Sequence, residues 1–336
     1  MSINKSVTTG NRNGKLTSEE LKRCVLSIIK RRRAEVLCGA GLGEDCASFA
    51  VGAGTGTAGL ASSEREAEIL VSSDPITSAE KDIGSLAVII NCNDISAGGG
   101  EPFALTLTLI MPTTGSAEEI SAIVRDAEAE ATRQNVEIIG GHTEFSDAVT
   151  RPIVSATVFG FAKKHRRATA CEAGDVLIMS KSAGLEGSFL LAEKHKAKLT
   201  HAEYTEAVSY KNLLSVRKDC EIAVGAGAVS LHDVTEGGVM GAVAELSEGA
   251  GLVATIYKDK VPVTAVTKKL AEAEGLDPLT MLASGAVIIT ATVAGAEGII
   301  IALAKAGITA TVIGRLEKGR QAEGAGLGTP KVGAKC

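Results

Sequence analysis

The spacing of hydrophobic residues alternates along the chain between a helical period and a strand period. Thr17 and Glu20 stand at the spacing of a capping box, and apolar residues at helical spacing follow them. This pattern predicts an amphipathic helix whose buried face carries Cys24. In residues 103–111, bulky apolar residues alternate with threonines, which predicts a half-buried strand.

The same two periods predict most of the remaining elements. Helices are expected at 83–94, around 120–127, and at 185–196, 203–216 and 238–248. Strands are expected at 68–74, 136–139, 152–162, 175–180, 252–257, 285–292 and 309–313, and the strand at 136–139 is expected to break at Gly140 and Gly141. This mixture indicates an α+β protein with mixed sheets.

A polar stretch near residues 166–173 separates two halves that both mix helices with strands. We therefore predict an N-terminal domain over 1–168 and a C-terminal domain over 169–316. Residues 317–336 are rich in glycine and hold almost no apolar residues, so they are predicted to form a flexible tail.

Composition and charge exclude several classes of protein. The chain of 336 residues is 45% hydrophobic and 22% charged, which rules out fibrous and disordered proteins. A net charge of −5 and 3% aromatic residues argue against a nucleic-acid partner. The longest uncharged run, 278–296, contains proline and glycine, so no membrane helix is predicted. Polar first residues and seven cysteines without a CxxC spacing favour the reducing cytoplasm.

Carboxylates stand beside small residues at four places where a regular element is expected to end. They are Glu44 with Asp45, Asp74, Asp94, and Asp233 with Glu236. Carboxylate oxygens bind Mg²⁺, which bridges to phosphate oxygens, and neighbouring glycines let backbone N–H groups approach a polyphosphate. Each carboxylate alone could instead cap a helix or a turn. The recurrence at four places favours a metal and phosphate site.

Two glycine pairs suggest contacts with an anion. Gly237 and the next glycine stand where a loop becomes a helix, and the free N–H groups of a helix N-terminus bind anions. The alternative is that Asp233 or Thr235 is simply the N-cap of this helix.

The second pair, Gly140 and Gly141, precedes His142, Thr143 and Glu144. A histidine beside two glycines and between two acceptors is a candidate phosphate or substrate contact, although a single histidine is more often structural.

Known nucleotide and nucleophile motifs are absent: the sequence has no GxxxxGK[ST], no GxGxxG followed by a helix, and no GxSxG. Cys24 and Cys92 fall within helical patterns and are interpreted as structural. Cys336 is the last residue, next to Lys335, and is either a mobile reactive thiol or an accidental terminal cysteine.

The order of the motifs GLGEDCA, SSD, NCNDISAGGGEP, IIGGHTE, GDVLIMSKSAGLEGS, LHDVTEGG and DPLTMLASGA resembles the aminoimidazole-ribonucleotide (AIR) synthase superfamily. The resemblance covers roughly residues 14–315. It implies an N-terminal α/β domain that closes a β-barrel across a homodimer, a C-terminal α+β domain, and ATP and Mg²⁺ bound between the two domains.

The resemblance also implies roles for individual residues. Metal ligands would be Asp45, Asp74, Asp94 and Asp233; residues that bind the nucleotide would be Gly43, Glu44, Asn93, Gly140, Gly141, Thr143, Thr235 and Gly237. Two positions depart from the family pattern: Glu44 replaces the usual aspartate, and His142 replaces a carboxylate. The second change removes one expected metal ligand.

Within the superfamily, the chain most resembles proteins of the hydrogenase-maturation carbamoyl dehydratase type. That resemblance implies that the Cys336 thiol carries a carbamoyl group, that a carbamoyltransferase is a partner, and that Glu236 or His142 is the base. The family's usual Pro-Arg-Ile before the last cysteine is Gly-Ala-Lys here. A small-molecule kinase or ATP-dependent cyclo-ligase, and a non-catalytic nucleotide-binding protein, remain alternatives.

Overall fold

The computed structural model describes residues 16–30, 33, 35–50, 67–77, 79, 81–319 and 331–332. The chain divides into two compact units, Met1–Arg31 and Arg32–Cys336.

The first unit contains a short helix, α1 (Ser18–Leu21), which continues as a π-helix over Lys22–Leu26. The predicted capping box is confirmed, because the Thr17 side chain accepts from the Glu20 N–H and the Glu20 side chain accepts from the Thr17 N–H. The prediction that Cys24 is buried was wrong: it is exposed. No residue of these two helices is buried, so their apolar residues do not pack into a core among the described residues of this unit.

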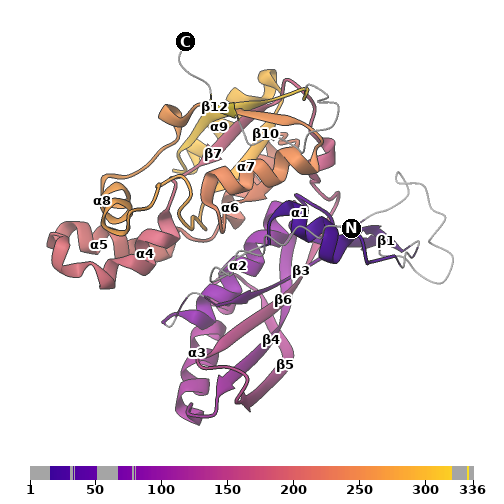
Figure 1. The fold of residues 1–336 in the computed structure, drawn as a ribbon. Helices are drawn as coiled ribbons and strands as arrows, with labels where there is room; N and C mark the ends of the chain where they lie inside the picture. Colours follow the sequence, from indigo (N-terminus) through magenta and orange to yellow (C-terminus); the bar gives the residue numbers. More distant parts are fainter. Residues whose placement is uncertain are drawn as a thin grey trace, which may run out of the picture. The chain divides into compact units, whose positions relative to one another are not determined.

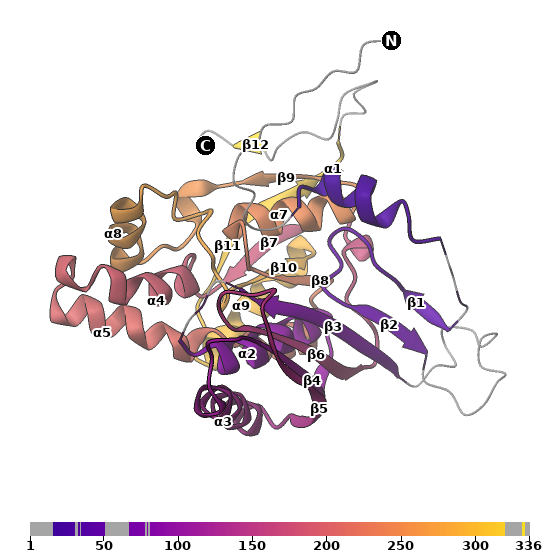
Figure 2. The ribbon, with the colours of Figure 1, turned by 60° about the horizontal axis from the view of Figure 1, so that its bottom comes forward.

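The second unit contains two six-stranded sheets. The first has the order β1-β2-β3-β6-β4-β5, and only β4 and β5 pair in parallel among its described strands. Its strands are β1 (Val36–Cys38), β2 (Ala47–Ala50), β3 (Glu68–Ile76), β4 (Glu101–Pro112), β5 (Glu137–Ser146) and β6 (Ile153–Ala162). The helices α2 (Ile83–Ala97) and α3 (Ala117–Arg133) cover one face of this sheet (Figures 1 and 2).

The predicted alternation in β4 is confirmed. Leu105, Leu107 and Leu109 are buried beneath the helices, whereas Thr106 and Thr108 are only partly buried on the opposite face. We call this opposite face, which no described helix covers, the open face of the first sheet.

The predicted break at Gly140 was wrong, because β5 continues through both glycines. Their φ values are +157° and +148°, and a Cβ atom on Gly141 would lie 1.8 Å from the carbonyl oxygen of Leu107. Gly141 therefore lets β5 run close to β4, and the strand does not end there.

Every residue of α2 is buried. One side of this helix packs on the first sheet, and the other contacts β8 (Ser230–Asp233) and α6 (Arg217–Gly225). A helix that is covered on all sides has no polar face, which explains why Asn91, Asn93 and Asp94 are buried in it and each needs a polar partner.

The second sheet has the order β12-β9-β11-β7-β10-β8. Besides β8, its strands are β7 (Val176–Ser180), β9 (Val253–Ile256), β10 (Val287–Ala291), β11 (Ala310–Glu317) and β12 (Lys331–Val332). Leu177 and Met179 face a core that includes α7 (Gly238–Gly249), whereas Ile178 faces the core beneath α6 and α9 (Val293–Lys305). Helices thus cover both faces of this sheet, and the sequence patterns had not predicted α6 or α9.

A third group of helices consists of α4 (Leu185–Lys194), α5 (His201–Ser209) and α8 (Ala265–Glu274), which contact one another. The predicted helix 203–216 is shorter than expected: α5 ends at Ser209, and a 3₁₀ turn covers Tyr210–Leu213. In the part of the chain that the structure describes, no helix is long and apolar enough to cross a membrane.

Candidate metal and nucleotide site

Four aspartates from different elements form what we call the carboxylate cluster: Asp45 before β2, Asp74 in β3, Asp94 in α2 and Asp233 at the end of β8. Burial raises the pKa of Asp94 well above its usual value, and the negative charges of Asp233, Asp74 and Asp45 raise it further. The structure therefore brings together all four residues that the sequence singled out as metal ligands. Carboxylate oxygens suit Mg²⁺, so this donor set fits the ion that the sequence implied.

Hydrogen bonds fix β3 against α2 within the carboxylate cluster. Ser72 Oγ donates to Asp94 Oδ2 over 2.5 Å. The backbone N–H of Asp74 donates to Asn91 Oδ1 over 2.7 Å, and Asn91 Nδ2 donates to the carbonyl oxygen of Asp74 over 3.1 Å. These bonds hold two of the four carboxylates at defined positions before any ligand binds.

His232, which the sequence reasoning missed, lies within the carboxylate cluster. Its Nδ1 is 3.1 Å from Asp45 Oδ1, and its Nε2 is 3.5 Å from Glu245 Oε2. Burial opposes protonation of His232, but Asp45, Glu245 and Asp233 together raise its pKa to about 9. The imidazolium thus supplies positive charge among the aspartates. Its position directly before Asp233 was the available signal.

Asp45, His232 and Asp233 also form a group that could hold a metal ion, because their ligand atoms all lie within 4.8 Å of one another. Loss of a proton from the imidazolium would free a nitrogen for the metal.

The helix α7 begins at a glycine pair beside Asp233. Gly237 and Gly238 have φ values of +80° and +60°, and a Cβ atom on Gly238 would lie 2.6 Å from the carbonyl oxygens of Leu279 and Met281. Gly237 is the N-cap, and no side chain caps the helix. The alternative that Asp233 or Thr235 is the N-cap was therefore wrong, and the first N–H groups of this 12-residue helix are not capped by a side chain.

Glu186, at the start of α4, is a second titratable residue that the sequence reasoning missed. It is buried, and burial raises its pKa to about 7, with smaller contributions from Asp233 and Glu236. A carboxyl group that titrates near neutral pH beside Glu236 can donate or accept a proton.

Glu44 and Asp45 are adjacent in sequence, but their side chains have different surroundings. Glu44 Oε1 accepts from Arg167 Nε over 3.2 Å, and Glu44 Oε2 lies 3.9 Å from His165 Nε2. Gly43, with a φ of +66°, lets this loop pack on α7, since a Cβ atom there would lie 2.5 Å from the carbonyl oxygen of Glu245.

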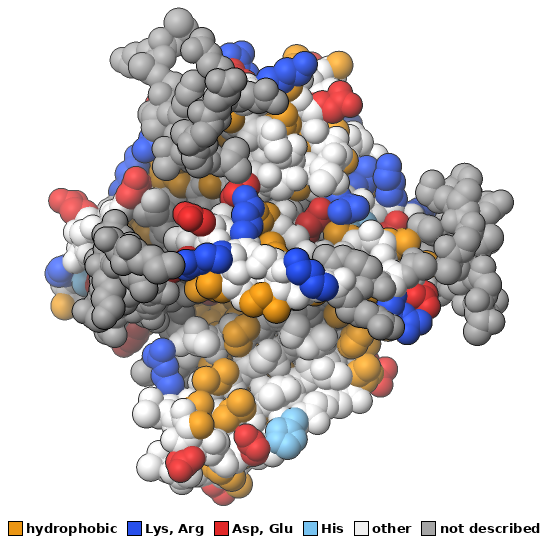
Figure 3. All heavy atoms as spheres, turned by 45° about the vertical axis from the view of Figure 1, so that its right-hand side comes forward, with side chains coloured by type: hydrophobic (Ala, Val, Ile, Leu, Met, Phe, Trp, Pro, Cys, Tyr) orange, Lys and Arg blue, Asp and Glu red, His pale blue; other side chains and the backbone are white. Residues whose placement is uncertain are grey.

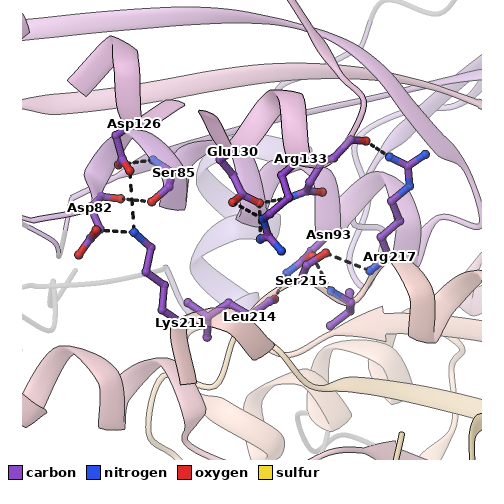
Figure 4. A network of polar contacts seen from close by, with 12 residues as sticks. Asp82, Ser85, Asn93, Asp126, Glu130, Arg133, Lys211, Leu214, Ser215 and Arg217 are labelled. Carbon is purple, nitrogen blue, oxygen red and sulfur yellow. Dashed lines mark hydrogen bonds and ion pairs between the residues drawn. The ribbon is translucent and has the colours of Figure 1, made fainter. Parts of the chain in front are cut away.

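Asn93 connects α2 to the segment before α6. Its Nδ2 donates to the carbonyl oxygen of Leu214 over 2.8 Å, and its Oδ1 accepts from the N–H of Val216 over 2.9 Å. Figure 4 shows this contact within a network that also joins Lys211 to Asp82. The amide of Asn93, predicted to bind the nucleotide, thus makes protein contacts with both of its polar ends.

His142 lies away from the carboxylate cluster within one chain. It pairs with Thr108 on the open face, and its Nε2 lies 3.3 Å from Glu144 Oε2. The register places Gly141, Leu107, Ala156 and Asp74 in one row across four strands, so β5 is three strand spacings, about 14 Å, from β3. Gly140 and Thr143 lie on the same strand, and Cys336 lies outside the described residues.

Comparison with known proteins identifies the family. The model of the AIR synthase related protein, N-terminal domain, matches residues 43–162, and the model of the C-terminal domain matches residues 172–325. The chain belongs to the AIR synthase related family.

The chain is similar to a hydrogenase expression/formation protein of Methanocaldococcus jannaschii, with 29% identity over 66% of each protein. The match thus spans just under two thirds of that relative. The chain is also 26% identical to the carbamoyl dehydratase HypE of Escherichia coli over 68% of each protein.

Solved structures share the fold. HypE in complex with ATP has a TM-score of 0.64 at 22% identity and covers 74% of this chain and 77% of its own. A HypE–HypF complex has a TM-score of 0.65 at 22% identity, and the match covers 75% of this chain and 85% of the other. ThiL complexed with AMPPCP and TMP has a TM-score of 0.67 at 16% identity, and the match covers 91% of this chain and 94% of the other. These likenesses show the mixed α/β fold of the family.

Proposed function

We propose that the chain is an Mg-ATP-dependent enzyme of the carbamoyl dehydratase type. The observation that carries the proposal is the convergence of Asp45, Asp74, Asp94 and Asp233 from separate elements beside the start of α7, which no side chain caps. A relative named carbamoyl dehydratase and a structural neighbour with bound ATP support it.

The aspartates would hold Mg²⁺, and the backbone N–H groups at Gly237 with Thr235 would bind phosphate oxygens. Bound Mg-ATP would supply the phosphoryl group for transfer to an oxygen of the substrate, and Mg²⁺ would neutralise charge on that phosphoryl group. Asp94 and Asp233 are buried, so water competes weakly for their oxygens.

The proposed substrate is a carbamoyl group carried on the sulfur of Cys336. Phosphorylation of its oxygen and removal of both N–H protons expel phosphate and leave a cyano group on the sulfur. Glu236 is the proposed base of the two candidates, because its charge acts on Glu186 together with that of Asp233, whereas His142 lies on the open face.

The remaining parts of the proposal are the boundary near residue 168, a cytoplasmic location and two protein partners. The first partner is a carbamoyltransferase, by analogy with the HypE–HypF complex. The second is another copy of the chain on the open face of the first sheet.

The open face supports the proposed homodimer. Phe103 and Phe161 stack there at 4.4 Å and are 37% and 49% exposed. Figure 3 shows exposed hydrophobic side chains in the lower part of the molecule, at the height of this sheet. Apolar faces of this kind are covered in most soluble proteins. Light scattering should give the mass of two chains, and Phe161→Glu should give that of one.

Mass spectrometry of the intact protein tests the enzymatic proposal. The protein is incubated with Mg-ATP, carbamoyl phosphate and a hydrogenase-type carbamoyltransferase while ADP release is followed. We expect a carbamoyl and then a cyano adduct on Cys336, and neither adduct in Cys336→Ala, which should keep its affinity for Mg-ATP. The control is Cys24→Ala, an exposed cysteine elsewhere. ADP release without an adduct would contradict the proposal.

A small-molecule kinase is the second candidate, favoured by the ThiL structure, which covers 91% of this chain. It predicts that removal of Cys336 leaves turnover intact. ATP binding without ADP release on any substrate would favour a non-catalytic nucleotide-binding protein.

A further inference from the structure

A second cluster of donor atoms includes Glu44, the neighbour of Asp45 in the chain. It consists of Cys38 at the end of β1, Glu44 in the loop before β2, and His165 in the segment after β6. One ligand atom from each residue lies within 4.8 Å of the other two. We propose that Cys38, Glu44 and His165 bind one transition-metal ion, and the donor set points to Zn²⁺.

The distances agree with a single ion. His165 Nε2 lies 3.9 Å from Glu44 Oε2 and 3.3 Å from the sulfur of a fourth residue, Cys46. Two ligands of one tetrahedral zinc ion, each about 2.0–2.3 Å from the metal, lie roughly 3.3–3.8 Å apart. The side chains therefore need only small movements to surround the ion.

The burial of the donors favours a ligand over an ordinary polar core. The side chains of His165 and Glu44 are 3% and 6% exposed. Among the described residues, none makes a hydrogen bond to Glu44 Oε2. A buried carboxylate oxygen without a partner is costly, and a metal ion bound to Glu44 Oε2 would satisfy it.

Charge and donor softness select the metal. A thiolate from Cys38 and a carboxylate from Glu44 would neutralise a divalent ion in this buried place, while Arg167 holds the other oxygen of Glu44 over 3.2 Å. A sulfur, a nitrogen and an oxygen together suit zinc, whereas Mg²⁺ prefers oxygen ligands alone. Binding displaces the Cys38 proton to solvent.

The bound ion would join two segments that are distant in sequence: the one from β1 to β2, which carries Cys38 and Glu44, and the one after β6, which carries His165. Because the loop before β2 also carries Asp45, the metal would fix one edge of the carboxylate cluster. This role is independent of the proposed carbamoyl chemistry.

Cobalt substitution provides the test, and it needs no enzyme activity. The purified full chain, stripped with a chelator, is titrated with Co²⁺ in a Cys336→Ser background, so that the terminal thiol cannot compete. We expect one equivalent to give the visible bands of tetrahedral Co²⁺ together with a near-ultraviolet thiolate-to-cobalt band, which an ion at the carboxylate cluster, without sulfur, cannot give. Zn²⁺ should displace the Co²⁺ at one equivalent.

Variants identify the ligands. Cys38→Ser should abolish the thiolate band, and His165→Gln and Glu44→Gln should each weaken binding at least about 10-fold. Cys24→Ser, at an exposed cysteine, is the matched control and should change nothing. Cys46→Ser decides the fourth position: a weaker thiolate band makes Cys46 the fourth ligand, and an unchanged band assigns water there.

Two results would overturn the proposal: no uptake of Co²⁺ or Zn²⁺, or uptake that persists with its band in Cys38→Ser. If Cys38→Ser does not fold, as judged by circular dichroism, the Glu44→Gln and His165→Gln titrations decide alone. Failure here leaves the carboxylate cluster and Mg-ATP binding unaffected, so it is distinguishable from failure of the proposed function.

Discussion

The carboxylate cluster and the Cys38–Glu44–His165 cluster are separated by one peptide bond, between Glu44 and Asp45, yet they differ in donors and in origin. The first collects carboxylates from both sheets and from α2, with the His232 imidazole among them and no sulfur. The second combines sulfur, nitrogen and oxygen from the first sheet and the segment that follows β6. The difference teaches that adjacent acidic residues in a loop can serve sites for different metals, since donor softness decides which ion binds.

The largest effect is expected from Asp45→Asn, which separates the two clusters directly. Loss of a partly buried ligand charge should weaken Mg-ATP binding by about 100-fold. The stoichiometry of Zn²⁺ at Cys38 should not change. Isothermal titration with both ligands measures the two effects, and Asp259→Asn, at an exposed carboxylate, is the control. Equal loss of both metals would refute two separate sites.

Asn93→Ala tests whether only the carboxylate cluster depends on the contact between the halves. The change leaves the carbonyl oxygen of Leu214 and the N–H of Val216 without their buried partner. We expect unfolding to become easier by about 2–4 kcal/mol and Mg-ATP binding to weaken, with Zn²⁺ retained. Urea denaturation gives the energy. The control is the exposed Asn212→Ala, and a cost below about 0.5 kcal/mol for Asn93→Ala would contradict the inferred contact.

Glu186→Gln tests whether a buried carboxyl group beside the carboxylate cluster makes the stability of the protein depend on pH. The folded-state pKa of about 7 lies above the unfolded value of 4.5, so the folded state binds this proton more tightly. The stabilisation is complete below about pH 4.5 and is lost as the pH rises through 7.

The wild type should therefore lose about 2–3 kcal/mol from this group between pH 4.5 and 8, and Glu186→Gln should not. Urea unfolding at several pH values checks the difference, with the exposed Glu118→Gln as the matched variant. Parallel curves for Glu186→Gln and the wild type would show that Glu186 does not titrate in this range.

The smallest effect is expected from Lys211→Met. Lys211 pairs with Asp82 and lies 3.8 Å from Asp126, but its side chain is 29% exposed, so solvent screens both interactions. We expect a loss of about 0.5–1 kcal/mol in unfolding and unchanged binding of both metals. A loss comparable to that of Asn93→Ala would mean that the ion pair, and not the buried amide, holds the halves together.

Residues in regular patterns were predictable because local spacing reflects burial. The alternation in β4, the capping box at Thr17 and the helix at 83–94 follow from neighbouring residues alone. The burial of Cys24 could not be predicted in the same way, because a row of apolar residues on a helix does not show whether another surface packs against it. Gly141 in β5 was misjudged because the residue that requires a glycine there, Leu107, lies on another strand.

The sequence by itself determined the alternating elements, the family motifs and the four aspartates, because short spacing and local chemistry are written along the chain. Only the tertiary structure decided that His232 joins the aspartates, that His142 does not do so within one chain, and that Glu44 and Asp45 serve different clusters. The physical reason is that a side chain's environment depends on which distant segments pack against it. His165 and Cys38 are 127 positions apart and meet only because β1 and the end of β6 lie beside the same loop.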